Sequence, residues 1–252
     1  REVLARYAGR LTAVFQANQG YAAAFNAGFA LSRGRIVCLL DADDVWLPGK
    51  LARVVRRFEA EPALSMVQHF LQDADAGLSP LAVEFPIWPA RTTLDDYLDG
   101  RAEFTATSGL SLRRETLAAA LPLPVALRFL YADDLLTVRA LARGPSGNIA
   151  EPLGLHRVHG ANFCAGTLAD PKKLASDLSM RRVYRENVDR LLTGLGREPG
   201  PRHRRLEELE LLRREILLHA YEGRRFSAFG LWLRGLSRAA TNPFGLFRVL
   251  SC

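Results

Sequence analysis

The sequence predicts an α/β protein in which a mostly parallel, Rossmann-like sheet with flanking helices is followed by a helical C-terminal extension. The first indication is an alternation of short apolar runs with amphipathic repeats over residues 11–70, in the order strand, helix, strand, helix, strand. Such alternation is typical of parallel sheets with crossover helices. The second indication is a change in sequence pattern beyond Cys164, where long segments with helical periodicity prevail. We therefore expect an α/β domain at 1–165 and a helical extension at 166–252.

The N-terminal residues predict several short elements. Residues 2–7 have the pattern of a helix end closed by Gly9, and residues 11–15 form a short predicted strand. A turn at 18–20 precedes a helix over 21–32, whose apolar residues fall on one stripe.

An apolar run at residues 36–40 ends abruptly in three carboxylates, Asp41, Asp43 and Asp44. A run this short and rich in branched residues predicts a strand buried on both faces. Ligands of open α/β sheets bind just beyond the carboxyl ends of strands, so a site is expected here. Because the carboxylates repel one another, we expect a cation to offset them, and Mg²⁺ or Mn²⁺ commonly bridges carboxylates to substrate phosphates. A helix-capping role for Asp43 or Asp44 is the alternative.

Pro48 suits the first turn of the next predicted helix, because its missing N–H needs no partner there. One face of this helix is expected to be apolar and the opposite face basic. The apolar positions are Leu51, Val54, Val55 and Phe58, and the basic positions are Arg53, Arg56 and Arg57. Pro62 ends the helix, and residues 64–70 predict the following strand.

Downstream, loops, helices and strands are predicted in turn. The expected elements are a loop at 72–89, a short helix at 92–98, a strand at 105–112 containing Ser108 and Gly109, helices at 114–120 and 133–142, and an extended segment at 148–156. Further helices are expected at 170–192 and 203–221. Pro and Gly residues between these segments mark the turns that separate them.

Composition and charge narrow the class of protein without choosing a partner. The 252-residue chain has 34 Lys and Arg against 27 Asp and Glu, and its net charge of +7 favours a nucleotide diphosphate, an anionic membrane surface or nucleic acid. No apolar run reaches membrane-spanning length. The widely separated Cys38, Cys164 and Cys252 lack metal-ligand spacing and indicate a reducing compartment, so we expect a cytoplasmic protein. Cys38 is expected in the core.

The segment from Asn18 to Pro48 resembles the family 2 glycosyltransferases, which have the GT-A fold of nucleotide-diphospho-sugar transferases. Their pattern is Asn-x-Gly, then Ala-x-Asn-x-Gly, then Gly before an apolar strand that ends in Asp-x-Asp-Asp and a Pro. The residues that carry it here are Asn18, Gly20, Ala24, Asn26, Gly28, Gly34, Asp41, Asp43, Asp44 and Pro48. A lone Asp-x-Asp is weak evidence for the family, whereas the ordered combination of these residues is specific to it.

Two downstream stretches resemble further elements of that family. Asp133 and Asp134, followed by Arg139, look like its acidic pair at a helix start, although Ala132 stands where the family often has Glu. A second stretch looks like its Leu-x-x-Tyr-Arg-x-His-x-x-Asn element. The matching residues are Leu153, Arg157, His159 and Asn162, with His156 in the Tyr place.

The resemblance implies roles for these residues. Inverting transfer needs a base that takes the proton of the acceptor hydroxyl, and Asp133 is the implied catalytic residue. The implied metal ligands are Asp41, Asp43 and His159. The implied donor- and nucleotide-binding residues are Asn18, Asn26, Asp41 and Arg157. Secondary candidates are Asp44 and Asp134. Simpler roles for the same residues stay open. Asp133 or Asp134 could cap a helix, His159 or Arg157 could be plain surface residues, and the Asn26 amide could fix a turn.

The resemblance therefore implies a metal-dependent inverting glycosyltransferase of the hexosyltransferase type, with a Mg²⁺ or Mn²⁺ cofactor. Its expected reaction moves a sugar from a nucleotide-diphosphate sugar to a glycan or lipid-linked acceptor in bacterial cell-surface polysaccharide synthesis. The family's first strand has no counterpart ahead of Asn18, so we expect the domain to be truncated at its N-terminus. The alternative is a non-catalytic nucleotide-sugar-binding module that keeps the GT-A fold.

The tail at 223–250 interleaves Arg with aromatic residues. This composition favours either a segment seated on anionic lipid at the inner membrane face or an amphipathic helix packed on the core. Nucleic-acid binding uses the same residue types, but no recognisable module accompanies them, so no nucleic-acid partner is expected.

Overall fold

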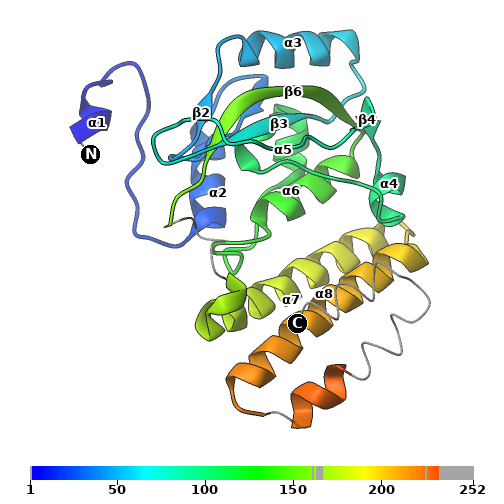
Figure 1. Cartoon of the computed structure of the whole chain (residues 1–252). Coiled ribbons are helices and arrows are strands. Elements are labelled where there is room, and N and C mark those ends of the chain that lie inside the picture. The colour runs from blue at the N-terminus through cyan, green and yellow to red at the C-terminus, as the bar shows by residue number, and fades with distance from the viewer. Residues whose placement is uncertain (1, 161, 163–166, 225, 233–252) are drawn as a thin grey trace.

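The chain folds as a mixed sheet between helices, with a further pair of long helices packed below (Figure 1). The computed structural model describes residues 2–160, 162, 167–224 and 226–232. The predictions for Cys164, for Cys252 and for the tail beyond Trp232 lie outside these residues.

The sheet of the described chain contains both parallel and antiparallel strands. Its strands are β1 (Ile36–Cys38), β2 (Val45–Trp46), β3 (Met66–Ala74), β4 (Arg91–Thr92), β5 (Leu110–Arg113) and β6 (Ser146–Arg157). The order is β1-β5-β3-β6-β2, and β4 also pairs with β6. The long β3–β6 pair is parallel, whereas β1, β2 and β4 each pair antiparallel with their neighbours, as β5 does with β3. The α/β class is confirmed, and β1, β3 and β6 run in the same direction. The described sheet is nevertheless mixed and not mostly parallel as predicted, because β3–β6 is its one parallel pair.

Three strand predictions differ from the structure. Residues 11–15 are exposed and make only an isolated bridge between Ala8 and Leu11, because no strand of the described chain lies beside them to pair their backbone groups. Strand β1 contacts apolar clusters on both faces but is only half-buried, because it lies at one end of the strand order. Ser108 and Gly109 lie in the 3₁₀ turn η1 (Thr107–Gly109), which precedes β5.

Helices α1 (Glu2–Ala5), α2 (Tyr21–Leu31), α4 (Leu94–Leu98), α5 (Arg114–Ala120) and α6 (Ala132–Leu141) confirm the predicted helical segments to within two residues, with α1 shorter than expected. Thr93 caps α4 by accepting a hydrogen bond from the Asp96 backbone N–H, while the Asp96 carboxylate accepts one from the Thr93 backbone N–H. Cys38 is half-buried and packs against the cluster of β3 and α3, as a small apolar residue does.

Helix α3 (Lys50–Ala60) differs from its prediction in start and in buried face. It begins after Gly49, whose φ of 87° places the backbone in the left-handed region, so Pro48 lies outside the helix. Val54 and Phe58 are buried as expected, whereas Leu51 and Val55 are 53% and 38% exposed. The third buried member of the stripe is Lys50, which has no exposed surface.

The helical extension packs directly on the α/β part. Helices α7 (Pro171–Gly194) and α8 (Pro201–Tyr221) follow a short turn, η2 (Thr167–Ala169), and Asp170 caps α7 through the Lys172 and Lys173 backbone. Side chains of α7, among them Tyr184 and Val188, join the main apolar cluster with α5 and α6. The proposed division into two domains stays a prediction. No helix of the described residues is long and apolar enough to cross a bilayer.

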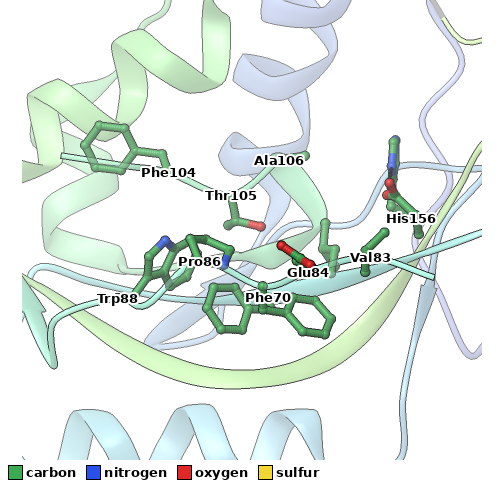
Figure 2. A pocket seen from close by; sticks show the side chains of 12 residues that line it. Phe70, Val83, Glu84, Pro86, Trp88, Phe104, Thr105, Ala106 and His156 are labelled. Atoms are coloured by element: carbon green, nitrogen blue, oxygen red, sulfur yellow. Dashed lines mark hydrogen bonds and ion pairs between the residues drawn. The ribbon is translucent and has the colours of Figure 1, made fainter. Parts of the chain in front are cut away.

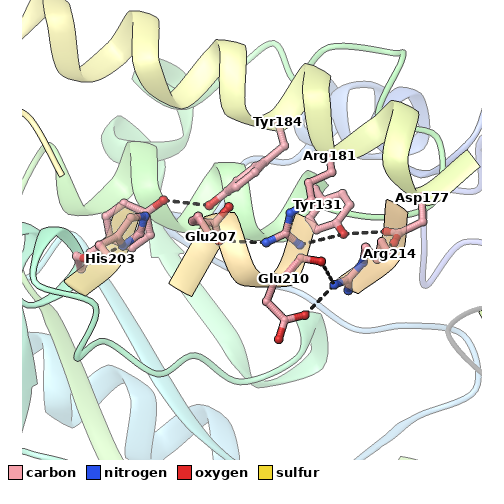
Figure 3. Close-up of polar contacts among 9 residues, drawn as sticks. Tyr131, Asp177, Arg181, Tyr184, His203, Glu207, Glu210 and Arg214 are labelled. Atoms are coloured by element: carbon pink, nitrogen blue, oxygen red, sulfur yellow. Dashed lines mark hydrogen bonds and ion pairs between the residues drawn. The ribbon is translucent and has the colours of Figure 1, made fainter. Parts of the chain in front are cut away.

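A buried network of charged and phenolic groups joins α7 and α8 to the residue that precedes α6 (Figure 3). Tyr131 donates to Asp177 over 2.5 Å, and Arg214 donates to the other Asp177 oxygen over 2.6 Å. Arg181 donates to the Tyr131 hydroxyl and to Glu207, over 3.2 and 2.9 Å. Tyr131 adopts a left-handed conformation with φ of 64° directly before α6, so this network holds the start of that helix.

Candidate active site

The carboxylates at 41, 43 and 44, which we call the acidic loop, are held between two distant segments. On one side, the Asp41 backbone N–H donates to the Ser108 hydroxyl over 2.9 Å. On the other, the Arg157 backbone N–H donates to Asp44 Oδ1 over 3.0 Å, and Arg157 Nε donates to the Asp43 carbonyl over 2.8 Å. The loop after β1 is therefore fixed by η1 and by the end of β6.

Arg157 is committed to this architecture. Its Nη1 donates to the Ala76 carbonyl over 2.8 Å while Nε bonds Asp43, so the guanidinium binds two backbone segments. This arrangement stabilises the acidic loop rather than presenting a cation for phosphate. Arg157 does lie beside the acidic loop, where a donor-binding residue was predicted.

Asp43 and His159 provide the part of the site that suits a divalent ion. His159 Nε2 lies 3.2 Å from Asp43 Oδ2, and Asp41 lies on the same loop. Among the described residues no group of three or more His, Cys, Asp or Glu is assembled as a metal cage. A carboxylate–imidazole pair fits an ion such as Mg²⁺ or Mn²⁺ that takes its remaining ligands from phosphates and water.

Asp133 is brought to the acidic loop from the first turn of α6. The Thr107 hydroxyl donates to Asp133 Oδ2 over 2.9 Å, and the Tyr21 hydroxyl donates to Thr107 over 2.8 Å. Thr107 is the neighbour of Ser108, which holds Asp41. The turn η1 thus bonds the predicted base with one residue and the acidic loop with the next.

The charges of these segments interact. Burial, followed by the neighbouring Asp44, Asp133 and Asp43, raises the pKa of Asp41 to about 6. Burial and the charges of Asp41 and Asp133 raise the pKa of Tyr21, which therefore remains a hydrogen-bond donor. After burial, the second cause of both shifts is negative charge concentrated in one place, which a bound cation would relieve.

Lys50 is a site residue that the sequence reasoning missed. Its Nζ donates to the Ser108 carbonyl over 3.0 Å and lies 3.7 Å from the centre of the Trp46 ring, while Trp46 Nε1 donates to the same carbonyl over 3.2 Å. Burial lowers the pKa of Lys50 to about 8. The available signal was its spacing, because Lys50, Val54 and Phe58 follow one another at intervals of four residues.

Two predicted binding residues bond the backbone of the protein itself. The Asn26 amide donates to the Leu123 carbonyl and accepts from the Leu123 N–H, both over 2.9 Å, which supports its structural alternative. Asn18 Oδ1 accepts from the Gly20 N–H over 3.0 Å and fixes the turn before α2. Asp134 follows Asp133 on α6, exposes its side chain and donates its backbone N–H to Asp133 Oδ1 over 3.2 Å.

Two pockets flank the acidic loop. One, of about 340 Å³, lies between α2 and β1 and has Asp41 and Thr107 at its edge. The other, of about 320 Å³, lies between β3, residues 83–88 and residues 104–106, with His156 at its edge (Figure 2). His156 directly precedes Arg157, whose backbone N–H donates to Asp44, so the second pocket also borders the acidic loop.

Residues 1–120 match the sequence model of Glycosyl transferase family 2. This part, slightly less than half of the chain, is therefore similar to that family. An uncharacterized glycosyltransferase of Nostoc sp. is 36% identical over 157 residues, which cover 61% of this chain and 48% of that protein. The chain therefore spans about half the length of this curated relative.

Solved structures confirm the GT-A fold of this chain. S. aureus TarS is 13% identical with a TM-score of 0.51, over 85% of this chain and 35% of TarS. TarS 1–349 in complex with UDP-GlcNAc is 9% identical with a TM-score of 0.52, over 95% of this chain and 79% of that one. At such identities the likeness concerns the fold alone.

Proposed function

We propose that the protein is a metal-dependent inverting glycosyltransferase that moves a sugar from a UDP-sugar to an acceptor hydroxyl in the synthesis of a cell-surface glycan. The observation that carries the proposal is the placement of Asp133 beside the acidic loop through Thr107 and Ser108. The choice of UDP rests on TarS, which has been solved with UDP and with UDP-GlcNAc.

In this proposal Asp43 and His159, with Asp41 beside them, hold a Mg²⁺ or Mn²⁺ ion against the donor diphosphate. When bound, such an ion stabilises the negative charge that develops on the leaving nucleotide diphosphate. Arg157 keeps the acidic loop in position through Asp43 and Asp44. Binding of the cation and donor should therefore depend on the end of β6 as well as on the Asp residues.

Asp133 has the role of general base. It accepts the proton of the acceptor hydroxyl as that oxygen attacks the anomeric carbon from the face opposite the departing diphosphate. Thr107, by donating to Asp133 Oδ2, fixes the orientation of the carboxylate, and Tyr21 in turn orients Thr107. The attack from one face and departure from the other produce inversion.

Two conservative substitutions test the proposal. UDP release from UDP-GlcNAc and related donors is measured with Mn²⁺, with EDTA and with a panel of saccharide acceptors. Asp133→Asn should lower kcat at least about a hundredfold while UDP still binds, and Asp43→Asn should weaken binding of Mn²⁺ and UDP. Glu59→Gln, which neutralises an exposed carboxylate of α3, is the matched control and should behave as the wild type.

The outcomes separate the two candidate functions. Turnover that survives Asp133→Asn at the wild-type rate contradicts the assignment of the base. Wild-type protein that binds UDP-sugar but neither hydrolyses nor transfers it with any acceptor supports the non-catalytic binding module instead. The observation that favours this second candidate is Ala132, which stands where the resembling family often has Glu.

A further inference from the structure

The second pocket described above, which we call the aromatic pocket, has walls suited to a saccharide ring. Phe70 of β3 lies between two aromatic neighbours, with ring centres 5.0 Å from Phe85 and 4.3 Å from Trp88. Phe104 closes the opposite side (Figure 2). At about 320 Å³ the pocket has the size of a small-ligand site.

Polar groups with unused hydrogen-bonding capacity face this pocket. The Thr105 hydroxyl and the Glu84 carboxylate project toward one another across it (Figure 2). The indole N–H of Trp88 is buried and has no hydrogen-bond partner among the described residues. A buried donor normally has a partner, so a hydroxyl-bearing ligand would satisfy it.

The charge of the pocket selects against an anionic ligand. The described residues that line it include the carboxylates Asp73 and Glu84 but no Arg or Lys, although the whole chain has a net charge of +7. Asp73 is paired with His156 over 2.9 Å at the edge of the pocket. Carboxylates accept hydrogen bonds from hydroxyls and repel phosphates, so an uncharged sugar fits better than a phosphorylated one.

The position of the pocket connects it to the predicted base. Its wall at residues 104–106 continues into Thr107, which donates to Asp133. On the other side, His156 directly precedes Arg157, whose backbone N–H donates to Asp44 of the acidic loop over 3.0 Å. The pocket therefore lies beside the segments that hold Asp133 and the acidic loop, where the donor sugar must react.

We infer that the aromatic pocket binds the acceptor as an uncharged saccharide, whose ring stacks on the aromatic wall and whose hydroxyls bond Glu84, Thr105 and the Trp88 N–H. This inference rests on the proposed function, since it assigns the acceptor class of the same site. Stacking on aromatic faces supplies affinity, and the polar groups orient one hydroxyl toward Asp133.

Calorimetric titration tests binding without any donor. The probes are cellobiose, maltose and N,N′-diacetylchitobiose, with glycerol 3-phosphate as a phosphorylated polyol. At least one disaccharide should bind the wild type, bind Trp88→Ala about tenfold more weakly and bind Phe226→Ala unchanged. Phe226 is the control because it is an aromatic residue that is 96% exposed and does not line the pocket. Trp88→Phe keeps the packing but removes the N–H, so its loss of disaccharide affinity should be smaller than that of Trp88→Ala. Glu84→Gln, on the exposed segment, should also show a smaller loss of affinity.

Several results overturn the inference. They are failure of every disaccharide to bind the wild type, equal binding by Trp88→Ala and Phe226→Ala, or displacement of a bound disaccharide by glycerol 3-phosphate. UDP binding and donor hydrolysis are measured on the same variants and should be unchanged. A wild type that binds disaccharide but never hydrolyses or transfers a UDP-sugar would refute the proposed function while leaving the saccharide site in place.

Discussion

Lys50→Met is expected to stabilise the protein at neutral pH, because it removes a buried charge. Lys50 has no exposed surface and burial lowers its pKa from 10.5 to about 8. That difference corresponds to about 3 kcal/mol against the charged form at pH 7. Methionine keeps the unbranched apolar stem but loses the hydrogen bond to the Ser108 carbonyl, worth about 1 kcal/mol. The net expected gain is about 2 kcal/mol at pH 7.

The sign of the pH dependence follows from proton binding. Between the folded pKa of about 8 and the unfolded value of 10.5, the unfolded wild type keeps a proton that the folded protein has lost. The contribution of Lys50 to wild-type stability therefore rises with pH through this window, whereas Lys50→Met lacks that rise. The advantage of the variant should be complete below pH 8 and should fall to zero or reverse near pH 10.

Urea denaturation of both proteins near pH 7 and pH 10 measures this change. Lys172→Met is the matched control, since Lys172 is exposed at the start of α7, and it should leave the free energy of unfolding unchanged at both pH values. A Lys50→Met variant less stable than the wild type at pH 7 would refute the reasoning. So would a stability difference that is the same at both pH values.

Two further predictions concern the turn η1. Thr107→Val keeps the shape of the side chain but removes the donor to Asp133, so kcat should fall about tenfold with UDP binding unchanged; the exposed Thr193→Val is its control, and an unaltered kcat would contradict the positioning role. Gly109→Ala should lower the free energy of unfolding by about 1–3 kcal/mol, because the added Cβ would lie 2.5 Å from the Thr105 side chain. Gly194→Ala, where no atom lies within 4 Å of the added Cβ, is the comparison in denaturant melts, and equal stability of the two variants would contradict the clash.

Elements with strong local signals were predicted well. Helix α5 has the expected bounds, and β3, β6, α7 and α8 lie where periodicity and Pro or Gly punctuation placed them. The error at residues 11–15 shows the limit of such signals. An apolar run favours a strand only if a partner strand lies beside it, and that condition depends on residues far away in the sequence.

In the candidate site, too, local motifs were predictable from the sequence and contacts between distant residues were not. The acidic loop, the Asp133 pair and His159 were singled out from local motifs, but the turn η1 that joins the loop to Asp133 was not. Asp41 bonds Ser108 at a separation of 67 residues, and Asp43 meets His159 at a separation of 116 residues. For Asn26 the structure supports the alternative of a structural amide, which residue type alone left open.

The sequence by itself determined the order of elements, the acidic end of β1 and the resemblance to family 2 glycosyltransferases, because these depend on spacing between near neighbours. Only the tertiary structure decided that η1 joins Asp41 to Asp133, that Lys50 is buried beneath it, and that an aromatic pocket with two carboxylates lies beside it. These features arise where the sheet brings separate segments into contact. Their burial and charge depend on that packing and on no single stretch of the chain.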